Sequence, residues 1–324
     1  MALTSVDGRS QMKSLKTALA VVVWLLISEA SLAAAPITPI TVRVRVHDPA
    51  GLPVEGATVS LALPRYGEPR DAGSQVLTDK TGVATLTGVA QWDYSIALKK
   101  SGYYATTVPK RTVASDYEIK LYATGVQQFD LELKPVRDPI PMLLGGTGMN
   151  SMPLPSLTQP VGYDLEKGDW VAPWGKGVTA DFVFQLTGPY TDRTKFDLTL
   201  TLTFPNPNDG IQFFEIPSDQ TSDFAFPYEA PASGYGPSRA WHWMQTPTTI
   251  KRDFSNTVRY IFRIRTELNP DGTIKHALYG YLWRDIEFYP GKDTTGLSLN
   301  YALNPTGTPN LEIDPKKSEV LKAP

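Results

Sequence analysis

The sequence contains no cysteine among its 324 residues. This absence excludes disulfides, thiolate metal sites, cysteine nucleophiles and a lipid-modified N-terminal cysteine. Small eukaryotic extracellular domains usually rely on disulfides. A cysteine-free chain that carries an export signal is therefore more typical of a bacterial periplasmic or secreted protein.

An excess of charge of one sign is also lacking. The chain has 31 Lys and Arg against 33 Asp and Glu, which gives a formal net charge of −2. Domains that bind nucleic acid or anionic lipid carry a basic patch or stripe. The balanced charge of this chain gives no sign of such a basic patch, so we expect no nucleic acid among the partners.

Recognisable catalytic motifs are missing as well. The three histidines, His47, His242 and His276, are too scattered in the sequence to indicate a triad or a metal site. No Gly-x-Ser-x-Gly elbow occurs, and the glycine run at 145–148 lacks the later glycine and lysine of a phosphate loop. We therefore expect no motif-defined catalytic residue, no metal and no cofactor.

Long hydrophobic runs are absent except near the N-terminus. Lys13 and Lys16 precede an apolar run of ten residues, Ala18–Ile27, which is too short to span a bilayer. This pattern is typical of a secretory signal peptide over residues 1–33, in which residues 1–11 are an extension upstream of the charged segment. We expect export to the periplasm or the extracellular space, with no membrane span after cleavage.

The rest of the chain is dominated by alternation of apolar and polar residues. Val42, Val44 and Val46 alternate with polar residues, and a longer row of the same kind runs over 196–204. Such alternation offers one apolar face to a core and predicts half-buried strands. No segment after the leader shows a helical period with caps, so we expect an all-β chain.

Composition also divides the chain into segments. We expect two domains, 36–135 and 161–313, because the length suits two and each half is apolar enough to bury a core. Residues 136–160 are rich in proline and glycine, which is typical of a linker or of a strap over a domain surface. Residues 314–324 are polar, and we expect them to form a tail.

Three segments of the first domain carry a resemblance to a known family. They are Asp48–Leu61, Thr78–Leu86, and Tyr94–Leu98 followed by Gly102 and Tyr103. At this spacing they resemble the carboxypeptidase regulatory-like domain. The resemblance implies a Greek-key sandwich of the transthyretin or immunoglobulin-like kind. The chain has no His-x-x-Glu motif, so the peptidase that accompanies this domain in zinc carboxypeptidases is absent. For the second domain we expect another antiparallel β-sandwich or a jelly-roll-like fold.

A hairpin around Asn269–Gly272 provides the candidate site. Proline and glycine suit a type I turn with a bulge, and the register that follows places Arg263 opposite Tyr279 and Glu267 opposite Lys275. One face of this hairpin is apolar. The other face gathers arginines, aromatic residues and carboxylates. The candidate ligand-binding residues on that face are Arg263, Arg265, Tyr279, Tyr281, Trp283, Asp285 and Glu287.

Two interpretations of this face stay open. Aromatic rings stack on sugar rings and charged groups bind hydroxyls, which would suit a sugar-binding platform. The second interpretation is a face stabilised by cation–π contacts and ion pairs, or one covered by the proline-rich segment, and we favour it because Arg–aromatic ladders are common on sheets.

These observations lead to a prediction of function. We expect an exported, non-enzymatic binding, structural or adhesion module, with the first domain as a spacer and the second as the part that binds a polysaccharide or a cell-surface protein. The alternative is a carbohydrate-active protein, either sugar-binding or a glycoside hydrolase that uses Asp285 and Glu287.

The leader generates the first testable prediction. Small residues at Ser31 and Ala33 suit a signal-peptidase site, whereas Pro36 opposes cleavage after Ala35. We expect the mature protein to begin at Ala34. Intact-mass measurement of the exported protein checks this, and a mass that retains the apolar run would identify the leader as an anchor instead.

Overall fold

The computed structural model describes residues 38–63, 73–90, 93–112, 126–216, 220–255 and 257–324. The expected signal peptide lies outside these residues. Within them every element of regular structure is a strand, so the predicted all-β fold is confirmed. No helix in the described part of the chain is long and apolar enough to cross a membrane.

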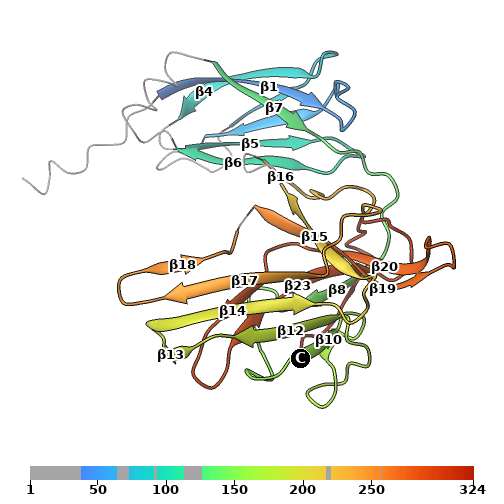
Figure 1. Cartoon of the computed structure of the whole chain (residues 1–324). Helices are drawn as coiled ribbons and strands as arrows, with labels where there is room; N and C mark the ends of the chain where they lie inside the picture. Colours follow the sequence, from blue (N-terminus) through green and yellow to red (C-terminus); the bar gives the residue numbers. More distant parts are fainter. Residues whose placement is uncertain (1–37, 64–72, 91–92, 113–125, 217–219, 256) are drawn as a thin grey trace, which may run out of the picture. The chain divides into compact units, whose positions relative to one another are not determined.

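Two sheets are built mainly of strands from the first half of the chain, most of which are labelled in Figure 1. The first sheet has the order β4 (Val83–Ala90), β1 (Thr38–His47) and β7 (Val126–Glu132). The second has the order β16 (Thr221–Ser222), β6 (Thr106–Thr112), β5 (Asp93–Lys99), β2 (Thr58–Ala62) and β3 (Gly73–Leu77). Val42, Val44 and Val46 are fully buried, as their alternation predicts.

Strands from the second half form two larger sheets. One has the order β11 (Asp169–Trp170), β10 (Val161–Asp164), β12 (Phe182–Thr187), β14 (Lys195–Thr203), β17 (Ser238–Gln245) and β18 (Ile250–Arg252), and β13 (Tyr190–Asp192) pairs with β14. The other has the order β15 (Gly210–Glu215), β19 (Val258–Leu268), β20 (Ile274–Leu282), β23 (Asn300–Asn304), β8 (Leu143–Gly146) and β24 (Glu319–Val320). A small third sheet holds β21 (Glu287–Tyr289), β22 (Gly296–Ser298) and β9 (Met152–Pro153).

The two larger sheets enclose a single large core. Phe184, Leu200 and Trp241 from the seven-stranded sheet share this core with Phe262 and Leu282 from the six-stranded sheet, and all five are fully buried. Alternation along β14 places its leucines and Phe196 inside and its threonines outside. A second β-sandwich follows the first, as predicted.

The six-stranded sheet is buried on its other face too. Ile261 and Tyr281 belong to a separate cluster on that face. Phe224, Phe226 and Leu311 pack there from outside the strands. The hairpin of β19 and β20 therefore lies between two apolar layers.

The described residues form two compact units. One takes the residues up to Val46 and those within 55–97 and 110–130, and the other takes His47–Val54, Leu98–Pro109 and Leu131–Pro324. The second unit thus includes short segments from the first half of the sequence. The predicted domain limits stay predictions. The three surface hollows described in the next subsection all lie in the second unit.

Two segments that composition marks as linker and tail contain strands. β8 and β9 lie inside 136–160, and β8 is hydrogen-bonded to β23 on one side and to β24 of the predicted tail on the other. The prolines flank Leu143–Gly146 rather than interrupt it, so its ladder groups remain available. Gly145 is required there because a Cβ would meet the ring of Tyr301. β8 and β24 are therefore strands of the six-stranded sheet, while the predicted limits of the linker and the tail stay predictions.

A buried ionic cluster joins the two larger sheets. Arg265 of β19 has a φ of 53° and donates to Asp164, Asp181 and Glu166. The Arg265 to Asp181 contact is 2.8 Å and the contact to Asp164 is 3.0 Å, and both aspartate side chains are at most 2% exposed. Burial opposes the charge of Arg265, but the three carboxylates outweigh it and raise the pKa of this guanidinium.

We predict that Arg265→Met strongly destabilises the second unit. The substitution leaves two buried aspartates without their cation, and breaking a buried pair in this way typically costs about 3–5 kcal/mol. Urea denaturation of the full chain measures the loss. Arg45→Met is the control, because Arg45 and its partner Asp130 are about half exposed and should contribute less than about 1 kcal/mol. Equal losses in the two variants would contradict the prediction.

Candidate functional site

The hairpin of β19 and β20 has the predicted register over most of its length. Arg263 opposes Tyr279 and Ile264 opposes Leu278. The turn closes as expected, with the Asn269 amide donating to the Thr273 carbonyl at 2.8 Å and Gly272 in the left-handed region. The turn chemistry and the apolar pattern thus agree with the structure.

The predicted register fails near the tip. Two irregularities shift the pairing, so Glu267 opposes His276 instead of Lys275, although the Lys275 amine still reaches Glu267 at 2.9 Å. The positive φ of Arg265 lies in the first irregularity. Arg265 therefore leaves the predicted face and joins the acidic cluster, where its guanidinium stabilises the fold.

Three other predicted residues lie on a covered face. Tyr279 is 6% exposed and Tyr281 is 1% exposed. The Tyr281 ring stacks on Phe226 at a centroid distance of 4.0 Å. Arg263 donates to the carbonyl oxygens of Asn208 and Ala232. The face is covered, as the favoured interpretation allowed, and the cover includes Phe224 and Phe226 as well as Met142 of the proline-rich segment.

The last three predicted residues line hollows beyond the end of β20. Half-buried Trp283 lines a hollow of about 170 Å³, here called the Trp283 hollow, whose other polar residues include Ser222, Asp223 and Arg259. Asp285 and Glu287 line a second hollow of about 240 Å³, the Asp285 hollow. Its remaining lining residues are Ser255, Arg259 and Arg284.

The two carboxylates of the Asp285 hollow differ in their surroundings. Asp285 is 6% exposed and accepts hydrogen bonds from the Trp241 indole, the Ser255 amide at 2.9 Å and the Ile286 amide at 3.1 Å. Burial raises the pKa of Asp285, and these donors oppose the shift. Glu287 is half-buried and accepts from the Tyr289 hydroxyl at 2.9 Å.

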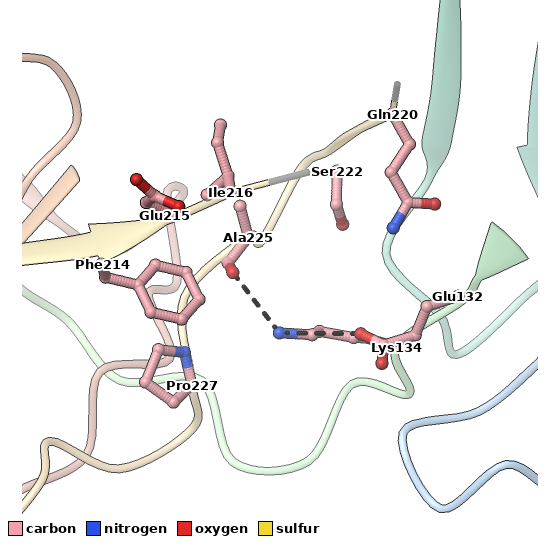
Figure 2. A pocket seen from close by; sticks show the side chains of 9 residues that line it. All are labelled: Glu132, Lys134, Phe214, Glu215, Ile216, Gln220, Ser222, Ala225 and Pro227. Carbon is pink, nitrogen blue, oxygen red and sulfur yellow. Dashed lines mark hydrogen bonds and ion pairs between the residues drawn. The ribbon is translucent and has the colours of Figure 1, made fainter. Parts of the chain in front are cut away.

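A third hollow of about 410 Å³ is the largest of the three and is called the Lys134 hollow. In Figure 2, Phe214 and Pro227 form an apolar wall on one side, and Lys134, Glu132 and Gln220 lie on the other. The remaining lining residues are Glu215, Ile216, Ser222 and Ala225. Apolar walls with a few polar groups are typical of ligand pockets.

The three hollows form a row. The Lys134 hollow and the Trp283 hollow share Ile216, Ser222 and Ala225, and the Trp283 hollow shares Arg259 with the Asp285 hollow. Residues within 214–216 and 220–227 line most of the first two hollows. Phe214 belongs to a part of the sequence without clear periodicity, and Lys134 belongs to no motif, so the sequence identified neither as a site residue.

Lys134 places a partly desolvated amine in its hollow. Its Nζ donates to the Phe226 carbonyl at 2.8 Å and lies 3.9 Å from a Glu132 carboxylate oxygen. The ring of Phe224 is 5.5 Å from the same amine. Burial lowers the pKa of Lys134, and the nearby Glu132 only partly offsets this.

Metal ligands are not gathered in the described residues, where no group of three or more His, Asp and Glu side chains could hold an ion. One histidine does make a close contact: His242 Nε2 lies 2.6 Å from Asp197 on the outer face of the seven-stranded sheet. Neither residue lines any of the three hollows.

Residues 41–125 match the family model of the carboxypeptidase regulatory-like domain. This confirms the resemblance found in the sequence motifs, for that part of the chain. The match ends before every residue that lines the hollows. No curated protein sequence matches the chain.

Comparison with solved structures finds matches that share little sequence with this chain. 3-Chlorocatechol 1,2-dioxygenase from Rhodococcus opacus 1CP is 13% identical, with 31% of this chain and 61% of that chain covered and a TM-score of 0.24. This chain thus spans less than two thirds of the dioxygenase. The shaft pilin SpaA from Lactobacillus rhamnosus GG is 12% identical, with 58% and 94% covered and a TM-score of 0.23. A protein described as carbohydrate-binding, from Bacteroides uniformis ATCC 8492, is 9% identical, with 81% and 97% covered and a TM-score of 0.20. Similarities at this level carry no argument about function.

The surroundings of Lys134 generate a prediction about its titration. Burial disfavours the ammonium form of Lys134, whereas the hydrogen bond to Glu267 raises the pKa of exposed Lys275. We expect Lys134 to lose its proton at a lower pH than Lys275. NMR titration of the reductively ¹³C-methylated protein measures both, with Lys134→Arg used to assign the signal. A Lys134 signal that titrates with or after Lys275 would show that its amine is not desolvated.

Proposed function

We propose that the chain is an exported, non-enzymatic binding protein that holds a saccharide in the row of hollows of its second unit. The observation that carries the proposal is the Trp283 ring, which lines a hollow beside Arg259, Asp223 and Ser222. Aromatic rings stack on the apolar faces of sugars, and charged groups and hydroxyls exchange hydrogen bonds with sugar hydroxyls.

Packing prepares Trp283 for this role. Its ring meets the buried Tyr281 edge-on at 5.7 Å, and Tyr281 in turn stacks on Phe226. A side chain held in this way loses little conformational freedom when a ligand arrives, which favours affinity. Tyr279 and Tyr281 are themselves too buried to offer a ring to a ligand.

The shape of the site favours a saccharide over a cell-surface protein. Protein interfaces of standard size bury about 800 Å² on each partner. The row instead consists of concave hollows of about 170–410 Å³ with several polar groups in each. Concave sites with convergent polar groups are typical of small ligands and chain ends.

The first half of the chain provides the support for two further parts of the proposal, namely export and a spacer role for the first domain. Residues 41–125 form a carboxypeptidase regulatory-like domain without the peptidase motif that accompanies it in zinc carboxypeptidases. The signal-peptide pattern at residues 1–33 supports a site of action outside the cytoplasm. We assign recognition to the second unit and spacing to this domain.

A glycoside hydrolase that uses Asp285 and Glu287 is the second candidate. It is favoured by the shared hollow and by the raised pKa of Asp285, which a general acid requires. It is opposed by the three donors that already engage both oxygens of Asp285. Binding without cleavage is therefore the better-supported proposal.

Trp283→Ala tests the proposed site. We expect a glycan array probed with the mature protein to identify a ligand, and calorimetry to show that Trp283→Ala weakens its binding about 10- to 100-fold, or roughly 1–3 kcal/mol. Trp174→Ala is the matched control, because Trp174 is 39% exposed and lines none of the three hollows.

Three outcomes would contradict this assignment. Equal losses in both tryptophan variants would point to a general effect on folding, which thermal unfolding detects. Failure of every glycan to bind would overturn the proposal. Release of sugar from a polysaccharide, abolished by Asp285→Asn, would favour the hydrolase.

A further inference from the structure

We infer that the row of hollows holds consecutive sugar rings of one neutral or amine-bearing polysaccharide chain, with the Lys134 hollow as a distal subsite. This inference rests on the proposed function and adds the length and charge of the ligand. It concerns residues around Lys134 that neither the sequence motifs nor the matched family identify.

Size is the first argument. Pockets for small ligands usually measure about 300–1,000 Å³. The Trp283 hollow of about 170 Å³ and the Asp285 hollow of about 240 Å³ each fall below that range, whereas the Lys134 hollow of about 410 Å³ lies within it. A ligand confined to Trp283 and its immediate neighbours would leave the largest hollow of the row unused.

Continuity is the second argument. Ser222 and Ala225 line both the Lys134 hollow and the Trp283 hollow, so the two hollows are direct neighbours. Arg259 connects the Trp283 hollow to the Asp285 hollow in the same way. The Lys134 and Asp285 hollows share no lining residue, so they are the two ends of the row. A linear chain fits this arrangement better than a single compact ligand.

The chemistry of the Lys134 hollow suits a second sugar ring. Figure 2 shows the ring of Phe214 beside Pro227, opposite the polar ends of Gln220 and Glu132. The apolar wall can take the CH face of a sugar, and the polar groups can bind its hydroxyls. Phe214 is itself supported by stacking on Phe226 at 6.1 Å, so the same phenylalanine that packs on Tyr281 also supports this wall.

The charges of the row select against acidic chains. The described lining residues include five carboxylates, from Glu132, Glu215, Asp223, Asp285 and Glu287, and three cations, from Lys134, Arg259 and Arg284. Lys134 already binds a backbone carbonyl and lies near Glu132, which leaves less of its charge for an anion. Like charges repel strongly in partly desolvated sites, so a chain of uronates or sulfated sugars is disfavoured.

A length series of oligosaccharides tests the inference on the full mature chain. The probes are cello-, malto- and chitosan oligosaccharides of one to six units, with oligogalacturonates as the acidic series. In the series that binds, we expect affinity to rise at least about tenfold between one and four units, because a second linked ring binds at high effective concentration. Oligogalacturonates should bind least.

Phe214→Ala should remove most of the gain in affinity that comes from added length. Phe213→Ala is the matched control, because Phe213 is the adjacent residue of β15, is 71% exposed and does not line the Lys134 hollow. Gln220→Ala is a second variant of the same hollow, for use if Phe214→Ala does not fold. Trp283→Ala should weaken binding at every length.

The outcomes separate this inference from the proposed function. Binding that does not depend on length, or a gain that survives both Phe214→Ala and Gln220→Ala, would overturn the inference and leave the binding function standing. Tighter binding of oligogalacturonates than of the neutral and chitosan series would overturn its charge component. Failure of every saccharide to bind would overturn both proposals.

Discussion

The second unit depends on one constraint, which is that the β19–β20 hairpin is buried on both faces. One face supplies Phe262 and Leu282 to the core between the two larger sheets, and the other packs Ile261 and Tyr281 under Phe226. Most side chains along the paired part of the hairpin are therefore buried in one of these two layers. The exposed parts of the hollows are therefore supplied near and beyond the end of this ladder, by Trp283, Asp285 and Glu287, whereas Tyr281 reaches the Trp283 hollow only as a side chain that is 1% exposed.

The bulge at Arg265 follows from the same constraint. A strand buried on both faces has no solvent-exposed side for an arginine, and a charge left unpaired there would be costly. The left-handed conformation of Arg265 turns its guanidinium to Asp164 and Asp181. Desolvation of the cluster is compensated by three carboxylate contacts and by backbone donors to Asp164. The hairpin keeps its register beyond the bulge because a second irregularity restores the pairing of Leu268 with Ile274.

Local patterns predicted local structure and failed where distant segments intervene. Alternation at Val42–Val46 and the turn at Asn269–Gly272 depend on neighbouring residues, so they could be interpreted correctly. The partners of Arg265 lie 84 to 101 residues away, and the cover over Tyr281 comes from loops without periodicity, so neither is visible in a short window. One signal was present: Ile261 and Ala277 make the supposed binding face more apolar than a solvated face requires. The proline-rich composition of 136–160 obscured a four-residue strand that its prolines only flank.

The described loop residues between β15 and β17 both cover the hairpin and line two of the hollows. Phe226 takes part in both, because its ring stacks on Tyr281 under the hairpin and on Phe214 at the wall of the Lys134 hollow. The carbonyl oxygen of Phe226 also accepts a hydrogen bond from the Lys134 amine. Covering the second face of the sheet therefore creates the row of hollows as a consequence of the packing. Walls anchored to the core in this way would offer the proposed saccharide a preformed site, and substitutions of the exposed lining residues would leave the packing of the hairpin below them unchanged.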